Sequence, residues 1–177
     1  MEYKTVKEAK EQEYINCIVE HIANVQKAFK NIKSSEKIME ILKNASTASD
    51  PLYMQALENS IKDHDKSKFG PEEFDAYRIE YYPVDDSEKK DNKSRMDNAW
   101  KHHYTLNKHH WDSWKACPNL MPLNCVVEMI CDWCAMSMKF GGKTIDWYNK
   151  QQNIILGAKQ KKIVEKVLLV YNHEFEI

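Results

Sequence analysis

The sequence contains little glycine and proline, and it has no long hydrophobic run. Only 4 glycines and 5 prolines occur among the 177 residues, which disfavours an all-β fold, because such folds need many turns. No apolar stretch is long enough to span a bilayer, and the first residues are polar and charged, unlike a secretory signal. We therefore expect a helical protein of the cytoplasm that has no membrane partner.

The sequence also lacks an excess of either charge. Lysine and arginine number 26 against 27 acidic residues, whereas a protein that coats nucleic acid carries a basic excess.

The cysteines number five, which is odd, and they lack the regular spacing of a disulfide framework. Free thiols in a reducing compartment explain them best. A four-cysteine zinc site is a minor alternative, because Cys131 and Cys134 form the only short-spaced pair.

Hydrophobic periodicity predicts an all-α fold in which residues 1–177 form a single bundle-like domain. The expected helices cover residues 6–32, 35–44, 50–65, 95–104, 123–140 and 156–171, and another begins at Pro71. Asp50 followed by Pro51 predicts the start of the third helix, and the glycines at 141–142 predict the end of the helix before them. Residues 83–94 are almost wholly polar, and we expect them to form an exposed, mobile loop that acts as a lid.

Two acidic residues interrupt the most apolar segment, residues 123–140. Glu128 and Asp132 are four residues apart, so they share one face of a helix that is hydrophobic nearly all round and therefore buried. A buried carboxylate costs on the order of several kcal/mol unless it is paired or binds a metal. We expect Asp132 to be a metal ligand; the alternative is a buried salt bridge to a lysine or arginine.

Three further residues can join Asp132. His21 lies on the apolar face of the first helix, where a lone histidine is more often a hydrogen-bonded core residue. His64 and Asp65 are consecutive, so on a helix they point about 100° apart and converge only where the helix ends or bends, as the break at residues 70–71 suggests. Imidazole nitrogens together with carboxylate oxygens suit Mn, Fe, Co, Ni or Zn better than Ca. The four residues together predict a metal site.

Four of the seven histidines fall between residues 100 and 114, as two adjacent pairs flanked by tryptophans. On an uninterrupted helix His103 and His110 would lie about 10 Å apart along the axis, too far to share one ion. Either the chain turns at Asn107, because asparagine is a poor helix former, or the two pairs have different roles. A solvated basic face is the remaining alternative, and the flanking tryptophans argue against it because they indicate that this run is packed.

The order of these residues resembles the HD superfamily of metal-dependent phosphohydrolases, and in particular a group of small, uncharacterised bacterial and phage proteins of HD type. EHIANV resembles the helix that carries the first ligand of that superfamily. DHDKSKF resembles its His-Asp-x-Gly-Lys segment, with Ser67 in place of the usual glycine, and EMICDW resembles the helix with the last aspartate. The resemblance covers about residues 20–142.

The resemblance implies a helical HD-type fold and metal-dependent hydrolysis of a small phosphate ester or anhydride, with a nucleotide as the substrate class. It implies that one or two divalent transition metals are bound, the first by His21, His64, Asp65 and Asp132, and the second by His103 and His110, with His102 and His109 close behind. It also implies catalytic roles for two residues: Lys68 would neutralise the charge on phosphate, and Glu128 would orient a ligand histidine or the attacking water.

Two alternative functions remain open. One is a dinuclear iron oxygenase of the same superfamily, whose second, histidine-rich metal site serves oxygen chemistry; iron content and a visible absorption band would identify it. The other is a non-catalytic protein whose metal holds its helices together while it binds a partner. In that case metal removal unfolds the chain, and no nucleotide is turned over.

Overall fold

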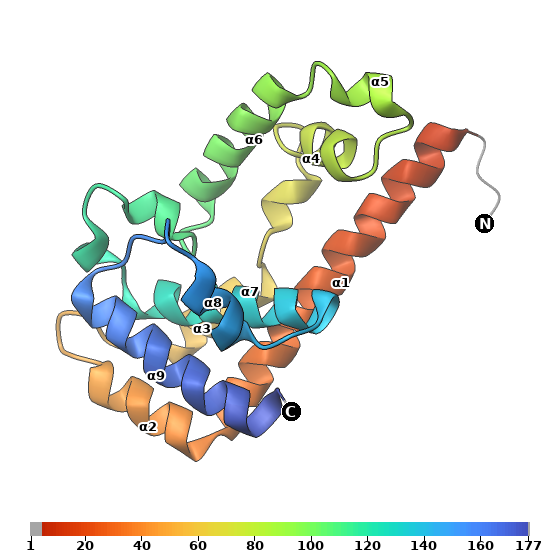
Figure 1. Cartoon of the computed structure of the whole chain (residues 1–177). Helices are drawn as coiled ribbons and strands as arrows, with labels where there is room; N and C mark the ends of the chain where they lie inside the picture. Colours follow the sequence, from red (N-terminus) through yellow and green to blue (C-terminus); the bar gives the residue numbers. More distant parts are fainter. Residues whose placement is uncertain (1–4, 177) are drawn as a thin grey trace. The chain divides into compact units, whose positions relative to one another are not determined.

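The computed structural model describes residues 5–176 and is all-α, as the sequence predicts (Figure 1). Helices account for 74% of it, and the described residues form no strand. The nine α-helices of the described chain are α1 (Val6–Ser34), α2 (Glu36–Ala45), α3 (Met54–Lys62), α4 (Phe74–Tyr81), α5 (Asp86–Lys89), α6 (Lys93–Leu106), α7 (Leu123–Phe140), α8 (Thr144–Lys150) and α9 (Ala158–Phe175). Three short 3₁₀ helices accompany them: η1 (Lys66–Phe69), η2 (Trp111–Trp114) and η3 (Pro118–Leu120). Among the described helices, none combines the length and apolar character that a membrane crossing requires.

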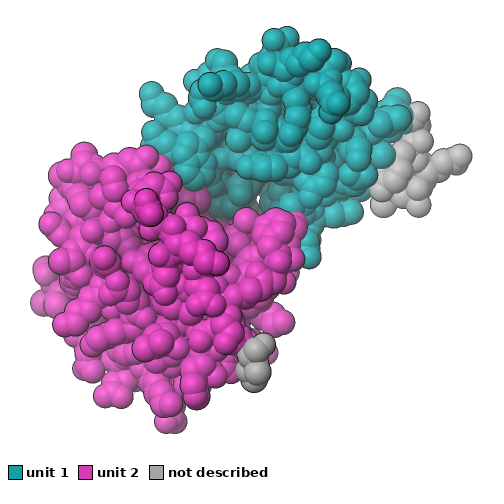
Figure 2. Space-filling view, viewed as in Figure 1, with its two compact units in different colours: residues 1–20, 65–107 teal, residues 21–64, 108–177 magenta. Residues whose placement is uncertain are grey.

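The chain divides into two compact units, which are coloured separately in Figure 2. Unit 1 comprises the described residues up to Glu20 together with residues 65–107. Unit 2 comprises residues 21–64 and the described residues from Lys108 onward. Whether the two units belong to the single domain expected over residues 1–177 stays a prediction.

Unit 2 contains the main hydrophobic core, built around α7. Ten residues of α7 are buried, and the helix packs against α3 and α9, while α2 lies along α9 (Figure 1). Its observed bounds are those predicted, because a run that is apolar nearly all round can lie only in a core. Cys131 and Cys134 are fully buried free thiols, and burial raises the pKa of both, so they remain protonated packing residues.

The start of α3 differs from the prediction. Asp50 was expected to cap this helix, yet α3 begins at Met54 and its N-cap residue is Tyr53. The Asp50 carboxylate instead accepts a hydrogen bond of 2.8 Å from the backbone N–H of Leu123, the first residue of α7. The N-cap residue of α7, Pro122, makes no side-chain cap of its own, so Asp50 supplies the acceptor that the helix needs.

In unit 1, residues 83–94 contain α5 and are held to α4 by buried contacts. The guanidinium of Arg78, only 1% exposed, donates two hydrogen bonds of 2.8 and 2.5 Å to the Glu88 carboxylate. Asn92, also 1% exposed, donates to the carbonyl of Ala76 at 2.9 Å. Polar composition predicted an exposed loop, and most of the segment is indeed exposed, but it contains the short helix α5 and is anchored by Glu88 and the buried Asn92. The mobility of the segment and its role as a lid stay predictions.

Candidate metal centre

Unit 2 brings together buried histidines and an aspartate from segments far apart in the sequence. His21 lies on α1, His64 just beyond the end of α3, His109 in the loop before η2, and Asp132 on α7. The three histidines are at most 8% exposed, and Asp132 is partly buried. One potential ligand atom from each of His64, His109 and Asp132 lies within 4.8 Å of the other two. These three residues could hold a metal ion, and we call them the three-ligand group.

Glu128 orients two of these imidazoles. Its Oε1 lies 3.0 Å from His64 Nδ1 and 3.2 Å from His109 Nδ1. Because an ionised carboxylate only accepts hydrogen bonds, both Nδ1 atoms carry the proton, and both Nε2 atoms keep a lone pair for coordination. Metal sites commonly fix the tautomer and ring position of their histidines by such a carboxylate. The predicted orienting role of Glu128 thus has a geometric basis for two histidines.

Both carboxylates of this cluster are ionised near neutral pH. Burial alone raises the pKa of Glu128, but the hydrogen bonds from His109 and His64 outweigh it and bring the pKa to about 2. Burial likewise raises the pKa of Asp132, and hydrogen bonds from His21 and His64 then hold it well below its usual range. Metal ligands must be deprotonated, so the cluster meets that requirement without further change.

His21 contacts the metal-ligand candidates through Asp132. Its Nε2 lies 3.0 Å from Asp132 Oδ1, and His64 Nε2 lies 3.8 Å from the same oxygen. The rings of His21 and His64 have centroids 5.3 Å apart, and those of His64 and His109 are 4.3 Å apart. His21 could therefore also coordinate an ion bound at this oxygen. The His21–Asp132 hydrogen bond would then be replaced by a bond from each residue to the ion.

His110 was predicted as a metal ligand ahead of His109, and which of the two binds a metal stays a prediction. His109 is 1% exposed and belongs to the three-ligand group, whereas His110 is only partly buried, its ring centroid 4.1 Å from that of His109. The helical phase linking the two pairs is lost because α6 ends at Leu106, and the Asn107 amide donates back to the His103 carbonyl at 2.9 Å. The turn at Asn107 was one of the two expected solutions.

Unit 1 holds the remaining two predicted ligands, Asp65 and His103, in contact with each other. His103 Nε2 lies 3.2 Å from Asp65 Oδ1, and its Nδ1 lies 2.8 Å from Glu73 Oε2. The other oxygen of Glu73 lies 2.8 Å from Nδ1 of His102. Burial lowers the pKa of His103, but its hydrogen bonds to Asp65 and Glu73 outweigh burial and raise it. Each ring nitrogen of His103 therefore faces a carboxylate.

Sequence reasoning missed Glu73, although it is completely buried. It follows Glu72 in a polar segment after Gly70, which reads as a surface turn. One indication was available: Glu73 lies four residues before the aromatic Tyr77, and residues at that spacing share a helix face.

Asp65 has an unusual backbone conformation. Its φ of 54° and ψ of 17° are left-handed, the sole case of positive φ among the non-glycine residues that the structure describes. This conformation is unfavourable for most side chains, although aspartate tolerates it better than most. Such strained positions gather at functional sites when the surrounding structure holds them in place. Because α3 ends at Lys62, His64 and Asp65 lie in a turn, at a helix end as predicted.

The serine that departs from the HD pattern has a local role. Ser67 Oγ accepts a hydrogen bond of 2.8 Å from the Asn107 amide, and it lies 3.3 Å from His103 Nδ1. One residue on, Lys68 Nζ donates to Asp65 Oδ2 at 2.6 Å. Ser67 thus stabilises the end of α6 next to His103, which a glycine would not do.

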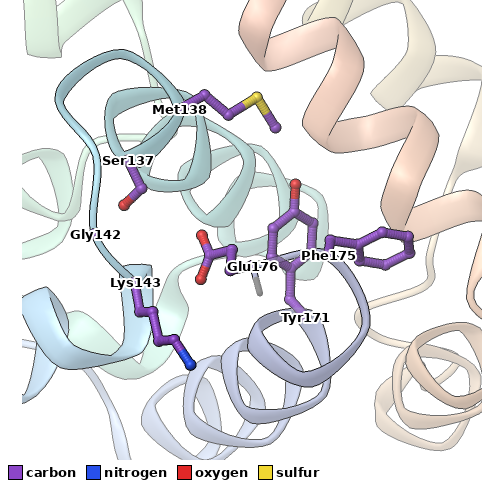
Figure 3. Close-up of a pocket in the computed structure, with 7 residues that line it drawn as sticks. All are labelled: Ser137, Met138, Gly142, Lys143, Tyr171, Phe175 and Glu176. Carbon is purple, nitrogen blue, oxygen red and sulfur yellow. The ribbon is translucent and has the colours of Figure 1, made fainter.

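A separate cavity of about 330 Å³ lies in unit 2, at the ends of α7 and α9 (Figure 3). Its lining consists of Ser137, Met138, Gly142, Lys143, Tyr171, Phe175 and Glu176, none of them a predicted site residue. The Glu176 carboxylate accepts hydrogen bonds from the Thr144 hydroxyl and, at 2.9 Å, from its backbone N–H. The acidic residue of this cavity therefore serves to cap α8.

Comparisons with known proteins identify the family of the chain, but they do not identify an activity. No curated protein and no solved structure matches the chain, so the resemblance to the HD superfamily rests on the sequence patterns alone. One family model matches residues 10–170, a range that includes both the unit 1 and the unit 2 clusters. Because this match covers nearly the whole chain, the protein belongs to the Family of unknown function (DUF5662).

Proposed function

We propose that the protein is a metal-dependent phosphohydrolase that cleaves a phosphate ester or anhydride of a small molecule, with a nucleotide as the substrate class. The observation that carries this proposal is the three-ligand group, in which Glu128 holds both imidazoles by their Nδ1 atoms. Two imidazole nitrogens with one carboxylate oxygen form a donor set typical of catalytic transition-metal sites, which leave a coordination position open.

The residues of the chain have distinct roles in this proposal. A bound divalent metal supplies Lewis acidity at a phosphoryl oxygen and lowers the pKa of a water molecule toward neutrality. Glu128 keeps His64 and His109 in the tautomer that presents Nε2, and the ionised Asp132 balances the charge of the cation. His21, at 3.0 Å from Asp132, provides a further donor.

The composition of the chain supports a small substrate. The formal net charge of −1 gives no basic surplus to attract a polyanion such as nucleic acid. In unit 1, Lys68 is the cation that matches the lysine of the HD pattern, and its side chain is 22% exposed, so it can approach a phosphate.

The first experiment measures metal content by elemental analysis on protein purified without an affinity-tag metal. We expect the wild type to carry a stoichiometric transition metal and Asp132→Ala to lose it. Asp146→Ala, which changes an exposed aspartate of the same unit, is the matched control and should retain the metal. A wild type that takes up none of Mn, Fe, Co, Ni or Zn contradicts the proposal.

The second experiment screens the metal-loaded protein for turnover of p-nitrophenyl phosphate, bis(p-nitrophenyl) phosphate and nucleoside mono-, di- and triphosphates. Phosphate release that depends on the metal and disappears in Asp132→Ala supports the proposal. Iron-dependent oxygen consumption without hydrolysis would favour the oxygenase instead. Unfolding on chelation, with neither activity, would favour a structural metal.

A further inference from the structure

Two tyrosine hydroxyls are buried in unit 1 without a hydrogen-bond partner. Tyr14 on α1 is 3% exposed and Tyr77 on α4 is 5% exposed, and neither hydroxyl has a hydrogen-bond partner among residues 5–176. Buried polar groups are nearly always satisfied, because leaving one unpaired costs its full desolvation penalty. Two such hydroxyls in one small unit therefore require an explanation.

Both phenols belong to the same region of unit 1. The ring of Tyr14 packs against Phe74, with centroids 5.2 Å apart. Phe74 and Tyr77 are three residues apart on α4, so they share a helix face, and Tyr14 lies on the side of α4 that carries Tyr77. The Tyr77 ring meets the His103 ring edge-on at 5.9 Å, and Lys68 Nζ lies 5.5 Å from its centroid.

The hydroxyls are permanent donors. Burial first, and then the charges of nearby groups including Glu73 and Asp65, raise the pKa of both Tyr14 and Tyr77 far above the ordinary value. Neither phenol ionises at physiological pH, so each can donate a proton to an acceptor. Both acidic residues already have partners of their own: Asp65 contacts Lys68 and His103, and Glu73 contacts His103.

We propose that Tyr14 and Tyr77 donate hydrogen bonds to a phosphoryl oxygen, with Lys68 as the charged partner, so that unit 1 contains a phosphate-binding subsite. The inference rests on the proposed function for its phosphate-bearing substrate. Lys68 and His102 are the partly exposed members of the region, with 22% and 35% of their side chains accessible, and they mark where an anion enters. A tetrahedral phosphate offers acceptors in several directions, which suits donors arriving from α1, α4 and η1.

The test replaces each tyrosine by phenylalanine, which removes the hydroxyl alone. Because neither hydroxyl has a hydrogen-bond partner in the described part of the chain, Tyr14→Phe and Tyr77→Phe should melt at or above the temperature of the wild type. The matched control is Tyr171→Phe in unit 2, since the Tyr171 hydroxyl accepts a hydrogen bond of 3.1 Å from Asn31 and is 1% exposed. We expect the control to melt a few degrees lower.

Phosphate binding is measured by calorimetry, in which inorganic phosphate is titrated into the full chain in the presence of Mn²⁺. Each of the Tyr14→Phe and Tyr77→Phe variants should bind phosphate about tenfold more weakly than the wild type, the effect of losing one hydrogen bond to a charged acceptor. Tyr171→Phe should bind it as the wild type does. Unchanged affinity in both unit 1 variants would mean that the hydroxyls hold only buried water, and this overturns the proposal.

Two further outcomes also overturn it. One is a fall in melting temperature of Tyr14→Phe or Tyr77→Phe that equals the fall in the Tyr171→Phe control, since that reveals an internal hydrogen bond. The other is a wild type that does not bind phosphate. Turnover of p-nitrophenyl phosphate separates this inference from the proposed function: hydrolysis with an unchanged KM in both variants defeats the subsite alone, whereas tyrosine-dependent phosphate binding without any hydrolysis defeats the phosphohydrolase alone.

Discussion

Glu128 in unit 2 and Glu73 in unit 1 make the same contacts in different settings. Each buried carboxylate lies within 3.2 Å of Nδ1 atoms from two histidines. Around Glu128 the histidines come from distant segments, and both belong with Asp132 to a group that could hold an ion. Around Glu73 they are neighbours on α6, and the far nitrogen of His103 is already paired with Asp65.

The difference teaches that a histidine–carboxylate pair does not by itself define a metal site. In unit 2 the orienting carboxylate leaves the opposite ring nitrogens directed at a third donor, which is the arrangement of a ligand set. In unit 1 each ring nitrogen of His103 faces a carboxylate, Asp65 on one side and Glu73 on the other, an arrangement that an internal ion pair would also have. Substitutions at equivalent places in the two units can break or sharpen this contrast.

The largest expected effect is on metal stoichiometry. His64→Ala removes a donor of the three-ligand group and should abolish stoichiometric metal binding, whereas His102→Ala should leave the metal content unchanged. Elemental analysis of the two variants, prepared side by side, provides the measurement. If His102→Ala also loses the metal, the contrast fails, because the unit 1 cluster would then be required for coordination.

The next effect is on stability. Glu73→Ala leaves the buried His103 with one carboxylate partner instead of two, and removing one partner of a buried ion pair costs about 3–5 kcal/mol. Urea denaturation should show this loss, and Glu73→Gln, which keeps an acceptor oxygen, should recover part of it. A Glu73→Ala protein as stable as the wild type would show that this carboxylate is not structural.

A smaller effect is expected on metal affinity when Glu128 is replaced. Glu128→Ala removes the acceptor that orients two imidazoles, and changes in such supporting residues typically weaken metal binding about 10- to 100-fold. Chelator competition measures the metal affinity, and the affinity of Glu128→Gln should lie between those of Glu128→Ala and the wild type. Equal affinities in all three proteins would remove Glu128 from the site.

The smallest effect concerns the acid sensitivity of the Arg78–Glu88 ion pair in unit 1. The Arg78 hydrogen bonds lower the pKa of Glu88 from 4.5 to about 2, so the ion pair stabilises the folded state fully above the unfolded pKa. That stabilisation declines as the pH falls from about 4.5 to about 2. Urea midpoints at pH 6 and pH 3 should therefore change less in Glu88→Gln than in the wild type. If the urea midpoint changed equally in both proteins, the Arg78–Glu88 pair would not contribute to the pH dependence of stability.

Local patterns predicted the elements, and long-range pairing determined most of what they missed. The bounds of α7 follow from hydrophobic periodicity, and the end of α6 at Leu106 follows from the poor helix former Asn107 after it; both signals are local. The Asp50 cap on α7 joins residues 73 positions apart, and no local pattern distinguishes it from a cap on its own helix. His64, Asp132 and Glu128 were identifiable because polar residues stand out in apolar helices or beside a helix end. Glu73 was not, since its neighbours are polar.

The left-handed backbone of Asp65 restricts which amino acids position 65 can accept. Two independent filters act there: the backbone favours Gly, Asn or Asp, and an ionised ligand or ion-pair role requires Asp or Glu. Only aspartate passes both, so glutamate, which preserves the charge, should be rejected by the fold. In a saturation library, selection for folded protein would retain Asn and Gly alongside Asp, and selection for function would retain Asp alone. Position 65 therefore allows the requirement for folding and the requirement for function to be measured separately at one residue.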